Sequence, residues 1–428
     1  MRPAVLAGTG TGSLTLVTRV PAADPATDGL PAGTARRQLG LVAAVQVLAM
    51  SVWFSTAAVV PSLEREWEIS SAGAAWLTTA VQVGFVAGAV VSAAINLSDR
   101  VSVPRLIAAC AVAAGAANLL VALVAGGLEA AIVLRFATGI ALAGVYPAGV
   151  KLMASWFRTG RGAAMGALVG ALTLGSAMPH LVNGLGGLPW EEVLIVTSLL
   201  AFAAGGAALR LREGPLLGAG APLHPAYVRE MFLDRFQLRV NLGYFGHMWE
   251  LYAFWTWLPA YLLASLEAWD PRTDWRVGAG LAAFAVIGVA GAAGCIAGGL
   301  AARRAGSARV AFLAMVVSAA CCVLSGLVFG VGPWLLLPFL MVWGFAVIAD
   351  SAQFSAALSD AADPRYVGTA LAAQMAIGFI ITVATIRLLP LLADQVGWRW
   401  SLTALAAGPA FGAAAIRTVS STRPARGA

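Results

Sequence analysis

The sequence predicts an all-α integral membrane protein in which twelve transmembrane helices form two similar six-helix halves. The composition, the length of the apolar runs and the distribution of arginine lead to this prediction. Apolar residues make up 60% of the 428 residues and charged residues 11%, with a mean hydropathy of +0.84. Because soluble domains carry roughly 25% charged residues, this composition excludes an ordinary soluble protein.

The apolar residues fall into runs of about 20, the length that a helix needs to cross a hydrocarbon core roughly 30 Å thick. Helices satisfy their backbone hydrogen bonds internally, and the sequence lacks the alternating segments of about ten residues that barrel strands would need. The predicted spans are 39–60, 73–95, 103–125, 128–153, 161–184, 190–210, 239–263, 277–301, 308–330, 333–355, 367–389 and 396–417.

The arginines predict the orientation of these spans. With the amino terminus in the cytoplasm, eighteen arginines fall on the cytoplasmic side, and only Arg65, Arg272, Arg276 and Arg399 fall outside. Cytoplasmic loops carry such an excess, and the number of spans is even if both termini lie inside. The net charge of +7 therefore marks orientation, and no basic stripe indicates a nucleic-acid partner. We expect a multi-pass protein of the inner membrane.

Composition also divides the chain into domains. Residues 211–238 combine Gly, Pro and mixed charges, which is typical of a linker. The first residues are rich in Pro, Gly, Ala and Thr, which indicates a disordered tail or a translation start placed too far upstream. The predicted domains are a cytoplasmic tail, an N-terminal bundle, a linker, a C-terminal bundle and a second tail, at 1–38, 39–210, 211–238, 239–417 and 418–428.

The two bundles match each other locally. Gly139 corresponds to Gly344 and Arg105 to Arg309, at an offset of about 200 residues that indicates a parallel internal repeat.

The loop between the second and third spans carries a recognisable motif. It resembles the Gly-x-Leu-x-Asp-Arg-x-Gly-x-x-Arg loop of the major facilitator superfamily, because Leu97, Asp99, Arg100 and Arg105 match. Ile95 and Ser102 replace the two glycines. The equivalent loop of the second half, residues 299–309, keeps both glycines and has Arg303 in the acidic position.

A longer stretch in the fourth and fifth spans resembles the same superfamily, particularly its organic-anion symporter branches. The matching positions are Arg135 to Gly139, Tyr146-Pro147, Lys151, Trp156-Phe157 and Arg161-Gly162. The resemblance implies the major facilitator fold, in which two six-helix bundles of a monomer surround a central cavity lined by helices 1, 4, 7 and 10. It also implies alternating access to that cavity.

The charged residues of the two motif loops are candidates for a cytoplasmic gate. A charge-assisted clamp there would pair with a neighbouring helix end and break when the bundles rock. Alternatively, the arginines only anchor the topology. The candidate gate residues are Asp99, Arg100, Arg105, Arg303, Arg304 and Arg309.

Arg135 is predicted to lie about seven residues inside the membrane, where an ionisable group is costly unless it faces a cavity or a partner. A guanidinium can hold a carboxylate bidentately, which indicates either an anionic substrate or an internal acid. Tyr244, His247 and Glu250 follow one another at three-residue spacing, and we expect them to share a face. An acid beside an imidazole suits a proton relay. Alternatively, Glu250 pairs with Arg135.

Further candidates for substrate binding or proton coupling are Tyr146, Asp350 and Arg387. Asp350 is a second acid that could carry a proton or pair with a base, or else a helix cap, and Arg387 either contacts substrate or reaches toward the membrane surface. Lys151 and His180 are weaker candidates. The aromatic side chains of the first and seventh spans would stack on a flat ligand or simply pack; they are Trp53, Phe54, Trp249 and Trp255.

No cofactor or metal is expected. The four cysteines lie in apolar runs without metal or disulfide spacing, which favours a packing role; they are Cys110, Cys295, Cys321 and Cys322. The sequence has no phosphate-binding loop, so nucleotide hydrolysis is not the predicted energy source.

The resemblance implies a secondary active transporter of a small solute and not an enzyme. The candidate residues favour an organic anion carried together with protons. One alternative is a proton-driven drug or metabolite efflux antiporter, because Gly175-Ser-Ala-Met-Pro179 faintly resembles the antiporter signature of exporters. An alternative of another class is a membrane receptor or scaffold without flux.

Overall fold

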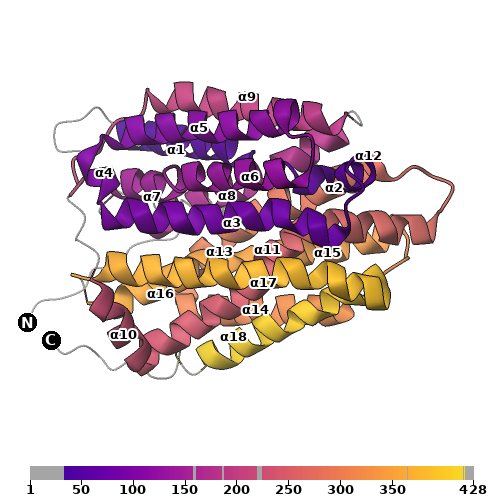
Figure 1. Cartoon of the computed structure of the whole chain (residues 1–428). Coiled ribbons are helices and arrows are strands. Elements are labelled where there is room, and N and C mark those ends of the chain that lie inside the picture. Colours follow the sequence, from indigo (N-terminus) through magenta and orange to yellow (C-terminus); the bar gives the residue numbers. More distant parts are fainter. Residues whose placement is uncertain are drawn as a thin grey trace, which may run out of the picture.

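The computed structural model describes residues 33–157, 161–185, 188–218, 224–363, 365–417 and 419, and these residues form helices and no strand. The helices lie side by side, with the first half above the second in Figure 1. The first half contains α1 (Thr34–Met50), η1 (Ala57–Val59), α2 (Val60–Glu66), α3 (Ser71–Ala94), α4 (Leu97–Arg100), α5 (Val103–Val124), α6 (Leu128–Leu142), α7 (Tyr146–Ala154), α8 (Arg161–Gly184) and α9 (Trp190–Ala208).

The second half begins with a short helix from the predicted linker. Its elements are α10 (Pro225–Leu233), α11 (Arg235–Trp269), α12 (Arg276–Ala283), the π-helix η2 (Phe284–Ala290), α13 (Gly291–Ala305), α14 (Ser307–Leu324), α15 (Pro333–Ala349), α16 (Ser351–Ala361), α17 (Val367–Ser401), η3 (Leu402–Ala406) and α18 (Ala407–Arg417). We call the left end of Figure 1, where α4 lies, the α4 end, and the opposite end the α2 end.

The all-α membrane architecture is confirmed. Nine stretches of the described chain are long and apolar enough to cross a membrane. One of them, Val367–Arg417, has 51 residues and contains a break at Gly397, where φ is 74°, so it holds two of the predicted spans. The remaining two predicted spans correspond to α1 with α2 and to α11. The structure is therefore consistent with twelve spans.

Equivalent glycines occupy equivalent contacts in the two halves. A Cβ atom on Gly139 of α6 would lie 2.2 Å from the carbonyl oxygen of Val81, and one on Gly344 of α15 would lie 2.2 Å from that of Val286. No side chain fits at such a distance, so only glycine allows either helix crossing. The same shift along the chain relates both members of the two pairs, which supports the internal repeat.

Three predicted spans are interrupted, which the sequence prediction of continuous helices missed. The interruptions lie at residues 51–56 between α1 and η1, at residues 143–145 between α6 and α7, and at Asp350 between α15 and α16. In the second, Pro147 has no N–H to donate to the carbonyl four residues earlier. Within this interruption, the Val145 carbonyl oxygen accepts hydrogen bonds from the Gly149 N–H at 2.9 Å and from the Gln46 amide at 3.1 Å.

The first helix begins before residue 39, where the N-terminal bundle was predicted to start. Because α1 begins at Thr34, residues 34–38 are helical; residues 1–32, 418 and 420–428 lie outside the described part. Described residues of the predicted linker contact both halves. Its Glu213 carboxylate accepts a hydrogen bond from the Val103 N–H of the first half at 2.8 Å. In α10, the Tyr227 hydroxyl accepts one from the Asp363 N–H of the second half at 2.9 Å.

Candidate functional site

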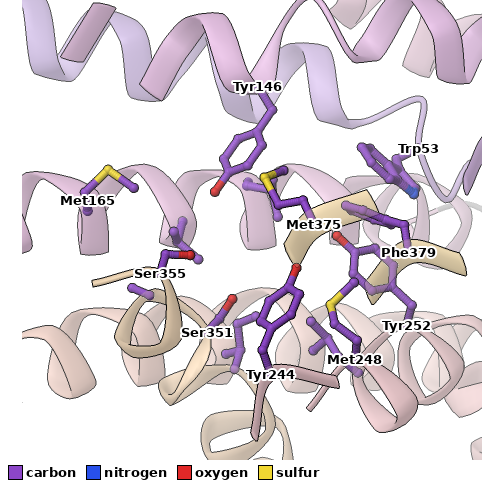
Figure 2. Close-up of a pocket in the computed structure, with 15 residues that line it drawn as sticks. Trp53, Tyr146, Met165, Tyr244, Met248, Tyr252, Ser351, Ser355, Met375 and Phe379 are labelled. Carbon is purple, nitrogen blue, oxygen red and sulfur yellow. The ribbon is translucent and has the colours of Figure 1, made fainter. Parts of the chain in front are cut away.

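A cavity of about 60 Å³, the volume of a few water molecules, lies between the two halves. Four helices line it as expected: helix 1 (α1 to α2), helix 4 (α6 and α7), helix 7 (α11) and helix 10 (α15 and α16). Helices 5 and 11 (α8 and α17) also contribute. Figure 2 shows Tyr146 of the first half and Tyr244 of the second directing their hydroxyl groups into the space between the two halves. The lining residues are Trp53, Tyr146, Met165, Val169, Leu172, Tyr244, Met248, Leu251, Tyr252, Ile348, Ser351, Ala352, Ser355, Met375 and Phe379.

The helix interruptions position this lining. Trp53 lies in the interruption of helix 1, Tyr146 is the first residue after that of helix 4, and Ser351 follows that of helix 10. No lining residue is charged. The cavity is also far smaller than the roughly 300–1,000 Å³ of a site for a drug-sized ligand, so this conformation is closed around little free space.

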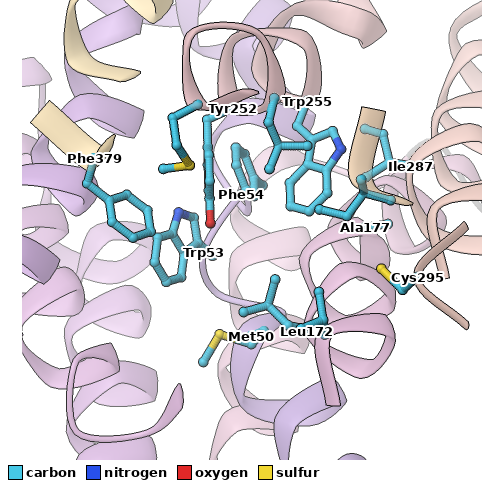
Figure 3. Close-up of a cluster of buried hydrophobic side chains, with 14 of the residues drawn as sticks. Met50, Trp53, Phe54, Leu172, Ala177, Tyr252, Trp255, Ile287, Cys295 and Phe379 are labelled. Carbon is cyan, nitrogen blue, oxygen red and sulfur yellow. The ribbon is translucent and has the colours of Figure 1, made fainter. Parts of the chain in front are cut away.

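Aromatic side chains of both halves close the cavity toward the α2 end (Figure 3). The ring centroids of Trp53 and Phe379 are 5.8 Å apart, and those of Phe54 and Tyr252 are 5.9 Å apart in a stacked arrangement. Trp255 meets Phe54 edge to face at 5.8 Å. Two of the aromatic residues noted in the sequence, Phe54 and Trp255, therefore pack, whereas Trp53 both packs and lines the cavity.

The Arg135 side chain is fully buried but does not face the cavity. Its guanidinium donates to the carbonyl oxygens of Val52, at 2.8 Å, and Trp53. It also donates to the side chains of Asn118 at 2.9 Å and Ser55 at 3.1 Å. These carbonyls belong to the interrupted part of helix 1, where backbone groups in a membrane need donors. They also lie at the negative end of the α1 dipole.

No acid pairs with Arg135 in the described residues, so the alternative in which it pairs with Glu250 is wrong. Its nitrogen donors are committed to acceptors of the first half. The expectation of an anionic substrate therefore loses the residue on which it rested.

His247 and Asp350 form an ion pair inside the second half. The His247 Nδ1 and Asp350 Oδ1 atoms are 2.8 Å apart, with 1% and 3% of the two side chains exposed. Asp350 lies between α15 and α16, but its side chain caps neither helix, so the cap interpretation is wrong. The Tyr244 ring, which lines the cavity, lies 6.0 Å from the His247 ring. This tyrosine connects the ion pair to the cavity.

Glu250 faces away from the cavity lining. Its Oε1 atom accepts hydrogen bonds from the hydroxyl of Ser318 and the indole of Trp343, each at 2.6 Å, and from the Cys322 thiol at 3.2 Å. The expected shared face with Tyr244 is wrong for a geometric reason. Each three-residue step falls about 60° short of a full helical turn, so six residues rotate a side chain by about 120°.

Arg387 lies at the contact between the two halves near the α2 end. Its guanidinium carbon is 3.8 Å from the centroid of the Trp76 ring on α3, a cation–π geometry. Arg387 does not line the cavity, and neither does His180, which is buried on α8.

The candidate gate residues lie at the α4 end. Lys151 of α7 forms an ion pair with Asp99 and donates to the Ser98 carbonyl oxygen at 3.0 Å, so this contact lies within the first half. Arg100, Arg105, Arg303, Arg304 and Arg309 are at least partly exposed. In the loop before α17, hydrogen bonds from Arg365 lower the pKa of Asp363 to about 2.

Sequence reasoning missed most of the cavity lining. Met165, Met248 and Met375 occur in apolar spans like any core methionine, and Ser355 had no distinguishing neighbour. Several lining residues stand beside residues that the sequence marked, since Ser351 follows Asp350, Met248 follows His247 and Leu251 follows Glu250, but this proximity did not identify them. A more useful signal was the combination of Pro147 and Gly144 after Arg135, which predicts an interruption beside Tyr146.

Comparison with known proteins identifies the family. The family model of the Major Facilitator Superfamily matches residues 42–386. No curated protein sequence matches the chain. A similar solved structure is a bacterial homolog of the human lysosomal transporter Spinster, inward-facing and unoccupied, with a TM-score of 0.70, 15% identity, and coverage of 92% of this chain and 99% of that one.

A second similar structure is a mutant of the nucleoside transporter NupG, with a TM-score of 0.66, 15% identity, and coverage of 90% of this chain and 99% of that one. At these identities the likeness shows the fold alone. The family match, in contrast, spans most of the sequence. The chain therefore belongs to the Major Facilitator Superfamily and is a multi-pass membrane transporter, not an enzyme.

Proposed function

We propose that this protein is a secondary active transporter that moves a small solute together with protons, or in exchange for them, by alternating access to the central cavity. The observation that carries the proposal is the buried His247–Asp350 ion pair at the interruption of helix 10. Ser351, the residue after Asp350, lines the cavity. A change in the charge of this pair therefore acts on helix 10, one of the helices that line the cavity.

The chemistry of the pair suits proton coupling. Ionisable groups inside a membrane are rare and mark ion and proton pathways, and histidine is the side chain that titrates nearest neutral pH. The attraction between His247 and Asp350 joins α11 to the junction of α15 and α16. Protonation of Asp350 removes this attraction. Loss of this attraction frees the interrupted helix to move. Tyr244, between the cavity and His247, offers a hydroxyl for proton passage.

The distribution of charge supports an inner-membrane orientation with the α4 end in the cytoplasm. Arginines that water reaches gather there, in α4, in the last turn of α13 and at the start of α5 and α14. Positive residues favour the cytoplasmic side. The closed aromatic layer then faces outward, and the cavity lies on its cytoplasmic side. The Asp99–Lys151 pair lies at the cytoplasmic end and fits a gating role in a monomeric carrier.

The direction of transport has two candidates. Symport of an organic anion was expected from Arg135, which is bound within the first half. An uncharged lining rich in aromatic and methionine side chains instead favours exchange of protons for an apolar drug or metabolite. Both use the same proton site.

Flux into proteoliposomes tests the proposal. Vesicles hold a pH-sensitive dye, and uncharged, anionic and cationic aromatic solutes are added with and without a pH gradient. One proton per solute allows about tenfold accumulation or depletion per pH unit. Asp350→Asn should make flux independent of the gradient. Asp360→Asn, which changes an exposed aspartate on α16, is the matched control and should behave as wild type. Gradient-dependent flux in Asp350→Asn, or gradient-independent flux in the wild type, would refute proton coupling through this pair.

A further inference from the structure

The central cavity contains hydrogen-bonding groups that the protein leaves unused. The hydroxyl groups of Tyr146, Tyr244, Tyr252, Ser351 and Ser355 belong to its lining, and none takes part in a hydrogen bond among the described residues. The indole N–H of Trp53, which is 1% exposed, also has no partner there. Buried polar groups are normally satisfied, so these groups indicate a ligand or water with several donors and acceptors.

The rest of the lining suits a flat apolar surface. Trp53, Tyr252 and Phe379 come together at one side of the cavity (Figure 2), with Tyr252 and Phe379 centroids 5.1 Å apart. Aromatic faces favour stacking on other rings. Thioethers make favourable contacts with aromatic edges and adapt to irregular shapes, and three of them, Met165, Met248 and Met375, come from three different helices.

The cavity offers no charge to balance an ionised ligand. Its lining contains only aromatic, aliphatic, thioether and hydroxyl side chains. The nearest buried ionisable side chains are bound within the protein and not directed at the cavity, since His247 and Asp350 are paired at 2.8 Å, and Arg135 donates to carbonyl groups of the first half. An ion transferred from water into such a site loses hydration without gaining a counter-charge.

We infer that the transported solute is an uncharged planar aromatic molecule with hydrogen-bonding groups on its edge, held between the hydroxyls of Tyr146 and Tyr244. This inference rests on the proposed function, because it takes the cavity as the transport site. The two tyrosines belong to opposite halves (Figure 2), so a ligand that bonds to both joins the halves. The cavity of about 60 Å³ is smaller than the roughly 150 Å³ that holds a benzene ring, so the cavity widens when such a ligand enters.

Equilibrium binding to the purified protein at constant pH tests the solute class separately from proton coupling. Benzamide, benzoate and benzamidinium serve as probes because they share one planar shape and differ in charge. We expect benzamide to bind at least tenfold more tightly than either ion. Tighter or equal binding of benzoate would overturn the inference in favour of an anion site. Tighter or equal binding of benzamidinium would overturn it in favour of a cation site, and failure of benzamide to bind would also overturn it.

Tyrosine variants locate the binding. Tyr146→Phe and Tyr244→Phe each remove one hydroxyl, and we expect benzamide affinity to fall about fivefold in each, the effect of one hydrogen bond. Tyr366→Phe is the matched control, because this ring lies at the α4 end beside Tyr227 and outside the cavity lining. Equal affinity in all three variants and the wild type would overturn the placement. If benzamide binds selectively but flux does not depend on the pH gradient, proton coupling is refuted and the inference about the solute class stands.

Discussion

The two halves of the molecule bury charge in different ways. In the first half, Arg135 donates to carbonyl and side-chain oxygens at the interruption of helix 1, and arginine does not exchange protons readily in proteins. In the second half, the buried side chains include two acids, Asp350 and Glu250, beside His247, whereas the described part of the first half buries His180 but no acid. The first half therefore uses its arginine to hold an irregular backbone together, and only the second buries carboxyl groups.

The largest expected effect comes from removing the cation of the first half. Arg135→Ala removes the side-chain donor of the Trp53 carbonyl oxygen and leaves only the Ser55 hydroxyl to serve both the Val52 carbonyl and the Asn118 amide oxygen, and unsatisfied buried groups are costly. We expect a loss of about 3–5 kcal/mol in stability, measured as thermal unfolding of the purified protein. The stability of Arg135→Lys should lie between those of the wild type and Arg135→Ala, because an ammonium group cannot reach all of these acceptors at once. An unchanged unfolding temperature in Arg135→Ala would contradict a structural role.

A smaller effect is expected at Glu250. Glu250→Gln keeps the Oε1 acceptor for Ser318 and Trp343, so stability should change by less than about 1 kcal/mol, whereas Glu250→Ala strands these donors and should cost about 2–3 kcal/mol. Because Glu250 faces α14 and α15, we expect Glu250→Gln to keep its response to a pH gradient. Gradient-independent flux in this variant would extend the proton pathway from Asp350 to Glu250, as the sequence first indicated.

The smallest stability change is expected at the α4 end. About a fifth of the Asp99 and Lys151 side chains is exposed, at 21% and 22%, and ion pairs that water reaches contribute about 1 kcal/mol or less. Asp99→Asn should therefore leave the unfolding temperature and solute affinity nearly unchanged but slow turnover, as measured by flux at saturating solute. A large loss of affinity would move Asp99 from the gate to the binding site.

Features that depend on composition and helix length were predictable from the sequence. Apolar runs and arginine sidedness predicted the helical membrane fold, and Gly139 with Gly344 predicted a repeat whose two contacts the structure makes equivalent. The partners of buried charges were not predictable. Arg135 bonds to an interruption 82 residues away at Trp53, and no local pattern marks that interruption. Glu250 was misplaced because three-residue spacing drifts around a helix.

The residues that line the cavity were also not predictable, because six helices contribute between one and four residues each. A methionine or serine in an apolar span has no sequence context that distinguishes lining from packing. Tyr146 was found only through its resemblance to a family motif, and Tyr244 through its spacing from His247.

The connection between the halves sets a limit on how far the carrier opens. The backbone is attached to the first half where the Leu216 N–H donates to the Ser155 carbonyl oxygen at 3.0 Å. It is attached to the second half where the His224 N–H donates to the Thr369 hydroxyl at 3.1 Å. Eight residues of extended chain reach at most about 28 Å. While both hydrogen bonds persist, this connection limits how far the two halves can separate at this end. It therefore also limits the width of a solute that can enter.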